Sequence, residues 1–474
     1  MIDDTYQGTS YMSIPFTPDE IAAEERRPKR KVAVIIGYAG TGYHGLQINH
    51  LEKTIEGDLF AAIVAAGAIS KANANDPKKS SLIRCARTDK GVHAASNVLS
   101  LKMIVEDEDI VDKINSHLPD QIRVWGIQRT TAGFNAHQGC DSRWYEYLMP
   151  SYALLPPQPH SFLGKKLVSS ATECGVLEEY QERLGDIKGF WEEVQKNDIQ
   201  PIMEKLDPAL RAEVENVMRD IGDQKFSDDP VEAAVEAVPA QAVEPEAPET
   251  EQAQEDAATA AKKDDEVMAD VLPAGAAVEA VADKPARVLT PLEVAVKEVK
   301  AAYVAAKRKY RTTPTRLEAF QKALDMYVGT HNFHNYTILK SANDPSAYRH
   351  IKSFKAETTP IHIGDTEWIS VKIHGQSFMM HQIRKMIAMA VMVVRCGAPL
   401  DLINQSYEHR RISIPKAPSL GLMLERPMFD EMNKQFVNFG REPLDLSKYE
   451  DKMKAFKDEH IYKRMFEVEE KENS

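Results

Sequence analysis

The sequence has few cysteines and no long apolar run. Its four cysteines, Cys85, Cys140, Cys174 and Cys396, contain no CxxC pair, which argues against a disulfide framework and a thiolate zinc site and favours a reducing compartment. The longest apolar run, MIAMAVMVV at 386–394, is too short to span a bilayer. The N-terminus is acidic and has no apolar core, unlike a secretory signal or an arginine-rich presequence. We therefore expect a soluble protein with no membrane partner.

A net charge of −13 would disfavour nucleic-acid binding if it were spread over the whole chain. Residues 223–284 hold 17 Asp and Glu against 4 Lys, a net charge of −13, so the remainder sums to zero. This segment is rich in Ala, Glu and Pro and poor in aromatic residues, which is typical of a disordered chain. It could mimic RNA electrostatically and tune binding, although a tolerated surface insertion is the favoured interpretation.

The first half of the chain predicts an α+β lobe. KVAVIIGY (31–38) predicts a strand, Thr54 can cap a helix, and SNVLSLKM (96–103) alternates like a half-buried strand. With the segments around them, they give a β, α, β, β, α, β rhythm that WYEYLMP (144–150) closes. The glycine-rich loop AGTGYHGLQ (39–47) lacks the spacing of a nucleotide-phosphate cradle.

The second half repeats this mixed character after a helical, charged interruption, which suggests two related lobes that face each other across a cleft. A capping box at Thr315 and Glu318 predicts a helix that ends at Gly329, and an apolar helix is expected over 378–394. The predicted organisation is a disordered tail (1–27), an N-terminal lobe (28–150), a helical insertion (151–222), an acidic linker (223–290), a C-terminal lobe (291–430) and a helical extension (431–474).

Two charged residues stand out for chemistry. Asp89 lies between bases in CARTDKGVHA (85–94), and Arg384 lies in the apolar helix. The aspartate could simply be a satisfied residue of an ordinary surface turn. An arginine that enters a core needs an anion, whereas a solvent-facing Arg384 needs none, and the pattern alone leaves both open. His381 is more often a satisfied interior histidine than a ligand.

Other motifs have plainer interpretations. Tyr145 and Tyr147 share one side of a strand, where they could be core residues or stack on a base. THNFHNYT (330–337) has two histidines but no cysteine or carboxylate at ligand spacing, so a hydrogen-bonded loop is favoured over a metal site. Basic clusters such as RRPKRK (26–31) and HRR (409–411) could contact phosphates, and the first resembles a nuclear localisation run.

Four pieces, GYAGTGYHGLQ, ARTDKGVHA, SRWYEYLMP and FMMHQIRKM, occur in an order that resembles the tRNA pseudouridine synthase A family. Lys90, THNFHNYT and the ending APSLGLMLE resemble its eukaryotic multisite branch, in a fungal-like form with an acidic insert. The resemblance implies the pseudouridine synthase fold, with two ferredoxin-like-derived lobes that share a mixed, mainly antiparallel sheet around an RNA-binding cleft.

The resemblance also implies roles for individual residues. Asp89 would be the catalytic carboxylate and would act at the base or at the sugar carbon. Tyr145 would stack on the target base and could assist proton removal, and Arg384 would pair with Asp89. Arg87 would take the space of the flipped uridine. The further substrate-binding residues that it implies are Lys90, Tyr43, Gln47 and His93.

The implied activity is isomerisation of uridine to pseudouridine in tRNA, at several sites of the anticodon stem and loop region. Small nuclear RNA and mRNA are further candidate substrates. A redox-neutral isomerisation needs no cofactor or metal. A monomer in the nucleus is expected. The alternative is a non-catalytic RNA-binding chaperone for tRNA, although mere binding needs no carboxylate that faces phosphates.

Overall fold

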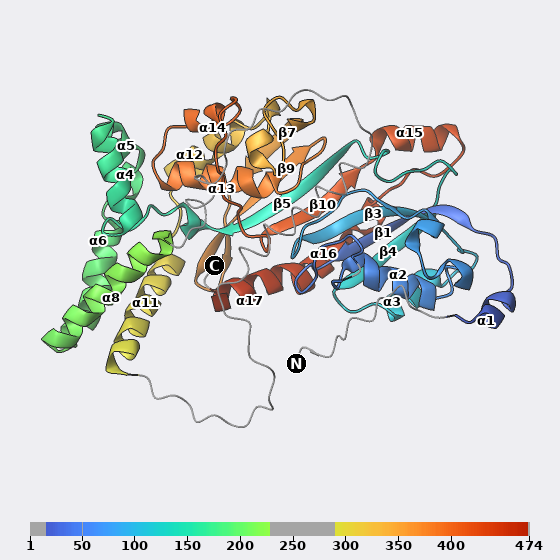
Figure 1. Cartoon of the computed structure of the whole chain (residues 1–474), viewed down its shortest axis with the longest axis horizontal. Helices are drawn as coiled ribbons and strands as arrows, with labels where there is room; N and C mark the ends of the chain where they lie inside the picture. The colour runs from blue at the N-terminus through green and yellow to red at the C-terminus, as the bar shows by residue number, and fades with distance from the viewer. Residues whose placement is uncertain (1–15, 50, 228–289, 473–474) are drawn as a thin grey trace, which may run out of the picture.

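The computed structural model describes residues 16–49, 51–227 and 290–472, and its centre is a ten-stranded sheet (Figure 1). The strand order is β4-β1-β3-β10-β5-β9-β7-β6, with β2 beside β3 and β8 beside β9. Only the β3–β10 pair is parallel, so the prediction of a mixed, mainly antiparallel sheet is confirmed. The strands are β1 (Arg30–Tyr38), β2 (Ile83–Arg84), β3 (His93–Met103), β4 (Ile122–Arg129), β5 (Ser142–Pro150), β6 (Gly329–Asn332), β7 (Tyr348–Ala356), β8 (Ile361–Ile363), β9 (Thr366–Gly375) and β10 (Leu422–Met428).

Helices pack against one face of this sheet in both halves of the chain. In the N-terminal lobe, α2 (Ile55–Ala65) and α3 (Ile110–Ser116) complete the predicted β, α, β, β, α, β order. The Thr54 hydroxyl accepts a hydrogen bond from the Gly57 amide at 3.3 Å, which caps α2 as expected. In the C-terminal lobe, α12 (Pro314–Asp325) and α13 (Gln382–Arg395) pack against the same face of the sheet, and α14 (Asp401–Gln405) follows them in the chain (Figure 1).

Two helix starts differ from the sequence prediction. Helix α12 is capped by Thr313 instead of Thr315, because Pro314 occupies its first turn, and it ends at Asp325, before Gly329 opens β6. Helix α13 begins at Gln382 instead of Phe378. His381, just before it, has φ of 62°, a left-handed conformation that interrupts a helix. The shorter helix places His381 at its N-terminal end.

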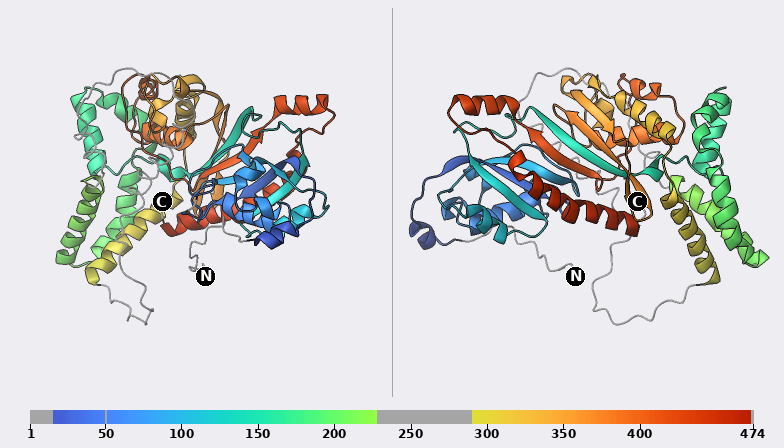
Figure 2. Two further views of the ribbon diagram at one scale, coloured as in Figure 1. Left: turned by 45° about the vertical axis from the view of Figure 1, so that its right-hand side comes forward. Right: turned by 180° about the vertical axis from the view of Figure 1, so that it is seen from behind.

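The C-terminal extension covers the opposite face of the sheet. It comprises α15 (Asp430–Asn438), α16 (Glu450–Phe456), a π-helix (Lys457–Tyr462) and α17 (Lys463–Glu472), and seen from behind α17 crosses in front of the strands (Figure 2). Phe456, Ile461 and Met465 pack there with Trp125 and Trp368. With both faces covered, β3 is buried except at Lys102, so the half-buried strand predicted there is wrong.

The helical insertion forms a small core of its own beside the sheet (Figure 1). Its helices are α4 (Phe162–Glu173), α5 (Leu177–Arg183), α6 (Phe190–Val194), a π-helix (Gln195–Ile199), α7 (Gln200–Glu204), α8 (Pro208–Ser227) and α11 (Pro291–Lys309). Two predicted boundaries shift, because α8 continues into the expected linker and α11 packs here instead of in the C-terminal lobe. The rest of the acidic linker, 228–289, lies outside the described residues.

The N-terminal tail contains a short helix. Helix α1 (Pro18–Ala22) has a capping box between Thr17 and Glu20, so residues 18–22 are ordered where a disordered tail was predicted. Residues 1–15 lie outside the described part of the chain. Within the ranges that the structure describes, no helix combines the length and apolarity needed to cross a bilayer.

A buried ion pair joins the insertion to the C-terminal lobe. The Arg316 side chain in α12 is 1% exposed, and its Nη2 lies 2.6 Å from Asp186 Oδ1 of the insertion. Its Nη1 donates to the carbonyls of Leu154 and Val394, at 3.3 and 3.2 Å. Val394 belongs to the last turn of α13, so this one guanidinium ties the insertion to that helix.

We expect Asp186→Asn to destabilise the protein strongly, because it leaves the Arg316 charge buried without a counter-charge. A loss of about 3–5 kcal/mol in the free energy of unfolding is expected, measured by urea denaturation. The double variant Arg316→Met/Asp186→Leu should lose less than the sum of its single changes. Glu318→Gln, which breaks the exposed Glu318–Lys322 pair on the same helix, is the control and should change stability by about 0.5 kcal/mol or less. An equally small effect of Asp186→Asn would contradict the proposed anchoring.

Candidate active site

A tight turn presents Asp89. The Val92 amide donates to the Asp89 carbonyl at 3.1 Å, and Gly91 has φ of 76°, which favours glycine. The loop 39–47 braces this turn, since the Leu46 amide donates to the Thr88 carbonyl at 3.2 Å. A Cβ on Gly45 would lie 2.8 Å from the same carbonyl oxygen, so the two loops can approach this closely only with glycine there.

The Asp89 carboxylate is held by residues of the other lobe. His381 Nδ1 lies 3.0 Å from Asp89 Oδ2, and Arg384 Nη1 lies 3.9 Å from the same oxygen. The Asp89 side chain is 26% exposed, whereas those of His381 and Arg384 are 2% and 12% exposed. An ionised carboxylate only accepts hydrogen bonds, so His381 Nδ1 carries the proton in this pair. The site therefore exposes one carboxylate edge and buries the groups that hold it.

The Asp89 pKa is below its ordinary value. Burial alone raises this pKa, but the hydrogen bond and charge of His381, with the charges of Arg384 and Lys416, lower it by more. Asp89 is therefore ionised at neutral pH. Such a carboxylate can act as a nucleophile or stabilise a developing positive charge.

Arg384 is fixed by the chain that leads into β10. Its Nε donates to the Ala417 carbonyl at 2.7 Å, and the Ala417 amide donates to the Arg384 carbonyl at 3.2 Å. The Tyr147 hydroxyl supports the same segment by donating to the Pro418 carbonyl at 3.1 Å. Of the two interpretations left open by the sequence, the structure thus contains the buried, anion-paired arginine.

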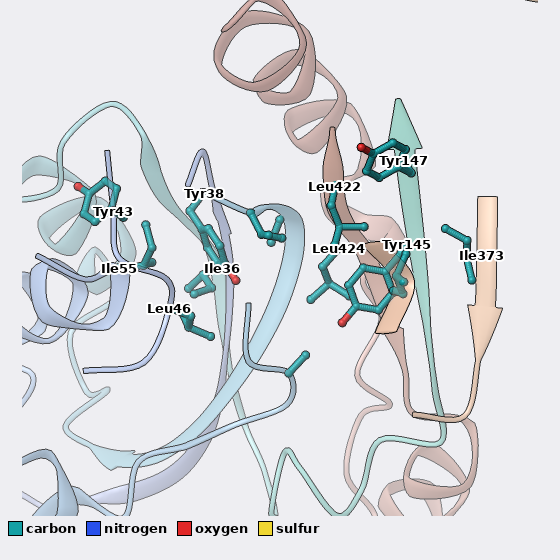
Figure 3. Close-up of a cluster of buried hydrophobic side chains, with 14 of the residues drawn as sticks. Ile36, Tyr38, Tyr43, Leu46, Ile55, Tyr145, Tyr147, Ile373, Leu422 and Leu424 are labelled. Atoms are coloured by element: carbon teal, nitrogen blue, oxygen red, sulfur yellow. The ribbon is translucent and has the colours of Figure 1, made fainter. Parts of the chain in front are cut away.

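Tyr145 and Tyr147 project from the same side of β5, and the Tyr145 hydroxyl points toward the Leu424 side of the sheet (Figure 3). The Tyr145 ring meets Phe378 edge-on, with ring centroids 5.2 Å apart. Among the described residues its hydroxyl has no hydrogen-bond partner. Burial raises the pKa of this phenol, so it is protonated at neutral pH. The structure does not place Tyr145 in direct polar contact with Asp89.

Arg143, on the same face of β5, is a residue that the sequence reasoning missed. It is buried, and it donates from Nη2 to the Cys85 carbonyl and from Nη1 to the Gln376 carbonyl, both at 2.9 Å. These carbonyls lie at the bases of the segments that carry Asp89 and His381. The sequence did contain a signal for Arg143. Residues 143, 145 and 147 share one face of the strand, and a charged residue on a buried face needs a specific partner.

The predicted substrate-binding residues divide into two groups. Arg87, Lys90 and Gln47 are exposed, and within the described ranges their side chains make no hydrogen bond or ion pair. Tyr43 and His93 are buried. The Tyr43 hydroxyl donates to Asp58 Oδ2 at 2.7 Å, and His93 Nδ1 accepts from the Gly40 amide at 3.2 Å.

Tyr43 and His93 are therefore engaged in contacts that hold the bracing loop. Burial lowers the pKa of His93 to about 4, so its ring is neutral and can accept this bond.

Hydrogen bonds hold the segment 330–337, in which His331 Nε2 lies 3.1 Å from the Val328 carbonyl oxygen. Asn335, in the same segment, donates from Nδ2 to the carbonyls of Ser406 and Arg410, both at 2.9 Å. Across the part of the chain that the structure describes, no group of three or more His, Cys, Asp or Glu residues could hold a metal ion.

Comparison with known proteins identifies the family. A sequence model described as tRNA pseudouridine synthase matches residues 323–430. The chain is 42% identical over 456 residues to tRNA pseudouridine synthase 1 of Candida glabrata, covering 96% of this chain and 70% of that protein. The chain belongs to the tRNA pseudouridine synthase family.

Two further relatives in this family extend the comparison. The tRNA pseudouridine synthase 1 of Saccharomyces cerevisiae is 43% identical over 437 residues, which cover 91% of this chain and 67% of that protein. The tRNA pseudouridine(27/28) synthase of the same organism is 35% identical over 407 residues, 85% of this chain and 86% of that protein. The family is thus shown over both lobes, although the matching model lies in the C-terminal one.

We expect His381→Phe to raise the Asp89 pKa, because the burial that disfavours the charge remains while the hydrogen bond is lost. Carbon NMR titration of the aspartate carboxyls would measure it. In the wild type, the stability that Asp89 contributes is present above its unfolded pKa of about 4 and is lost as pH falls through the lower folded pKa. The difference in melting temperature between wild type and variant should therefore be larger at pH 7 than at pH 3. His117→Phe, at an exposed histidine, is the control, and an unchanged Asp89 titration would contradict the assigned contact.

Proposed function

We propose that this protein isomerises uridine to pseudouridine in tRNA, with Asp89 as the carboxylate that bonds transiently to the target nucleotide. The observation that carries the proposal is the ionised, partly exposed Asp89 held by His381 and Arg384. A tRNA substrate is also supported by the relatives, which are tRNA pseudouridine synthases. The proposal covers several uridines of the anticodon stem and loop region, with small nuclear RNA and mRNA as further substrates.

The reaction exchanges one bond to the sugar for another. The bond from N1 to the sugar carbon breaks, the uracil turns, and a bond from C5 to that carbon forms, while the proton lost from C5 is balanced by one gained at N1. Asp89 can attack the base or the sugar carbon, since a carboxylate can form a bond and leave again. Arg384 and His381 keep it ionised until it reacts.

Tyr145 and Arg87 have supporting roles in this proposal. The Tyr145 phenol is protonated at neutral pH, because burial raises its pKa. This favours packing of its ring against the target base over proton removal. Arg87 is exposed two residues before Asp89, and the proposal gives it the space that the flipped uridine leaves in the RNA. Lys90 and Gln47 are exposed beside it and can contact the RNA backbone.

The direct test is Asp89→Asn, which removes the nucleophile but keeps the side chain's size. Conversion of uridine in tRNA, read by carbodiimide-blocked primer extension, should fall to background. Asp112→Asn, at an exposed acid in α3, should keep wild-type conversion. Conversion of uridine by the Asp89→Asn variant would show that Asp89 is not the catalytic carboxylate. Binding of tRNA by a wild type that converts no uridine would favour the chaperone alternative.

We also propose that the protein acts as a monomer in the nucleus. The basic run 26–31 supports the location, because Arg26 and Arg27 are exposed ahead of β1, although Lys29 donates to Ser70 Oγ at 2.7 Å. Arg26→Ala/Arg27→Ala should reduce nuclear accumulation of a fluorescent fusion, whereas Arg395→Ala/Arg441→Ala, at two exposed arginines elsewhere, should not. A cytoplasmic wild-type fusion would overturn the proposed location.

A further inference from the structure

Three consecutive basic residues of the C-terminal lobe have no acidic partner. His409, Arg410 and Arg411 are exposed, and within the described ranges their side chains make no hydrogen bond or ion pair. Two other exposed arginines, Arg30 and Arg129, both lie beside Glu106, at 3.4 and 3.0 Å. Residues 409–411, which we call the HRR loop, thus present uncompensated positive charge.

The HRR loop is held in place by a buried amide. Asn335 is 3% exposed, and its Nδ2 donates to the carbonyls of Ser406 and Arg410 at 2.9 Å, while its Oδ1 accepts from the Ile412 amide at 3.0 Å. One side chain thereby fixes the backbone on both sides of Arg411. A loop fixed in advance loses less conformational freedom when it binds a ligand.

A buried histidine lies behind the same loop. His334 is 2% exposed, and neither ring nitrogen has a partner at hydrogen-bonding geometry among the described residues, although backbone groups of Asn332 and Arg410 lie beside the ring. Burial lowers the pKa of His334, and the charges of Arg411 and His409 lower it further. The His334 ring thus lies close to the backbone of Arg410 and carries no charge that could neutralise the loop.

Hydrogen bonds connect this loop to the segment that holds Asp89. The Lys385 ammonium, next to Arg384, donates to the carbonyls of Asn335 and Thr337 at 3.4 and 3.2 Å. The Thr337 hydroxyl donates to the carbonyl of Met380, the residue before His381, at 3.0 Å. On the other side of the loop, the chain continues to Ala417, which binds Arg384.

The chain connection limits how far the HRR loop can lie from the residues around Asp89. Lys416, whose charge acts on Asp89, is five positions after Arg411, so this stretch of chain spans at most about 18 Å. A nucleic-acid strand bound at Asp89 could bring phosphates within that reach. Arginine suits this ligand, because its guanidinium forms paired hydrogen bonds with phosphate oxygens.

We propose that the HRR loop is a phosphate-binding clamp for the RNA strand on the C-terminal-lobe side of Asp89. Arg410 and Arg411 contact the phosphates, and Asn335 is a positioning residue. The inference rests on the proposed function, because it takes RNA as the substrate. It goes beyond that function by assigning a backbone-binding site to a loop that does not touch Asp89.

The test is the full-length variant Arg410→Gln/Arg411→Gln, compared with wild type in binding a tRNA transcript over a range of KCl concentrations. Loss of two phosphate contacts should reduce the slope of log K against log salt by about 1.4 to 1.8. In turnover assays, KM should rise while kcat stays near wild type, because the clamp is remote from the reacting atoms. Arg395→Gln/Arg441→Gln makes the same charge change at two exposed arginines elsewhere and should leave the salt slope unchanged.

A salt slope for Arg410→Gln/Arg411→Gln equal to that of wild type, or an equal drop in the control variant, would overturn the clamp. Asn335→Ala should raise KM at unchanged kcat, with a melting curve to show that it is folded, and a fall in kcat alone would argue against its positioning role. Failure of the proposed function can be distinguished from failure of the clamp. If the wild type binds tRNA without converting uridine, the salt slope can still be measured.

Discussion

The contact on which the candidate site depends is the one between Asp89 and the start of α13. The N-terminal lobe supplies the turn and the C-terminal lobe supplies His381 and Arg384, so groups of the other lobe lower the Asp89 pKa against the effect of burial. A partly buried carboxylate without these partners would bind a proton more readily. The packing of the two lobes across β5 and β10 is therefore a condition for the chemistry as well as for the fold.

Buried charges hold the elements that make this contact. Arg143 joins the bases of the two site segments through main-chain carbonyls, and Arg316 joins the far end of α13 to the insertion. Glu146, which projects from the opposite side of β5 to Tyr145, is buried. Its carboxylate oxygens lie 3.1 Å from Lys372 Nζ and 3.7 Å from Lys457 Nζ. Because Lys457 belongs to the C-terminal extension, the extension is bound directly to the strand that carries Tyr145.

The sequence predicted the N-terminal lobe well, because Thr54 is a strong local cap and β1 is a continuous apolar run. It also predicted that Arg384 pairs with Asp89, through motifs that resemble a known family. It predicted a satisfied interior histidine at position 381, inside an apolar helix, but did not identify Asp89 as its partner. Only the left-handed backbone at His381 takes it out of that helix and turns it toward Asp89, and a pattern of apolar spacing carries no information on that angle.

The other errors have a common physical cause, namely partners that are distant in sequence. The alternation in 96–103 predicted one solvent-facing side, but the C-terminal extension, more than 300 residues later, covers it. Tyr43 and His93 lie in motifs that suggested RNA contact, yet both side chains are buried, with the Tyr43 hydroxyl bound to Asp58 and His93 Nδ1 bound to the Gly40 amide. In both cases the local pattern shows which side chains are polar or apolar, whereas the tertiary packing decides which of them remain available to a ligand. Arg87, Lys90 and the HRR loop remain available by this criterion, the first two in the lobe that carries Asp89 and the third in the lobe that carries His381 and Arg384.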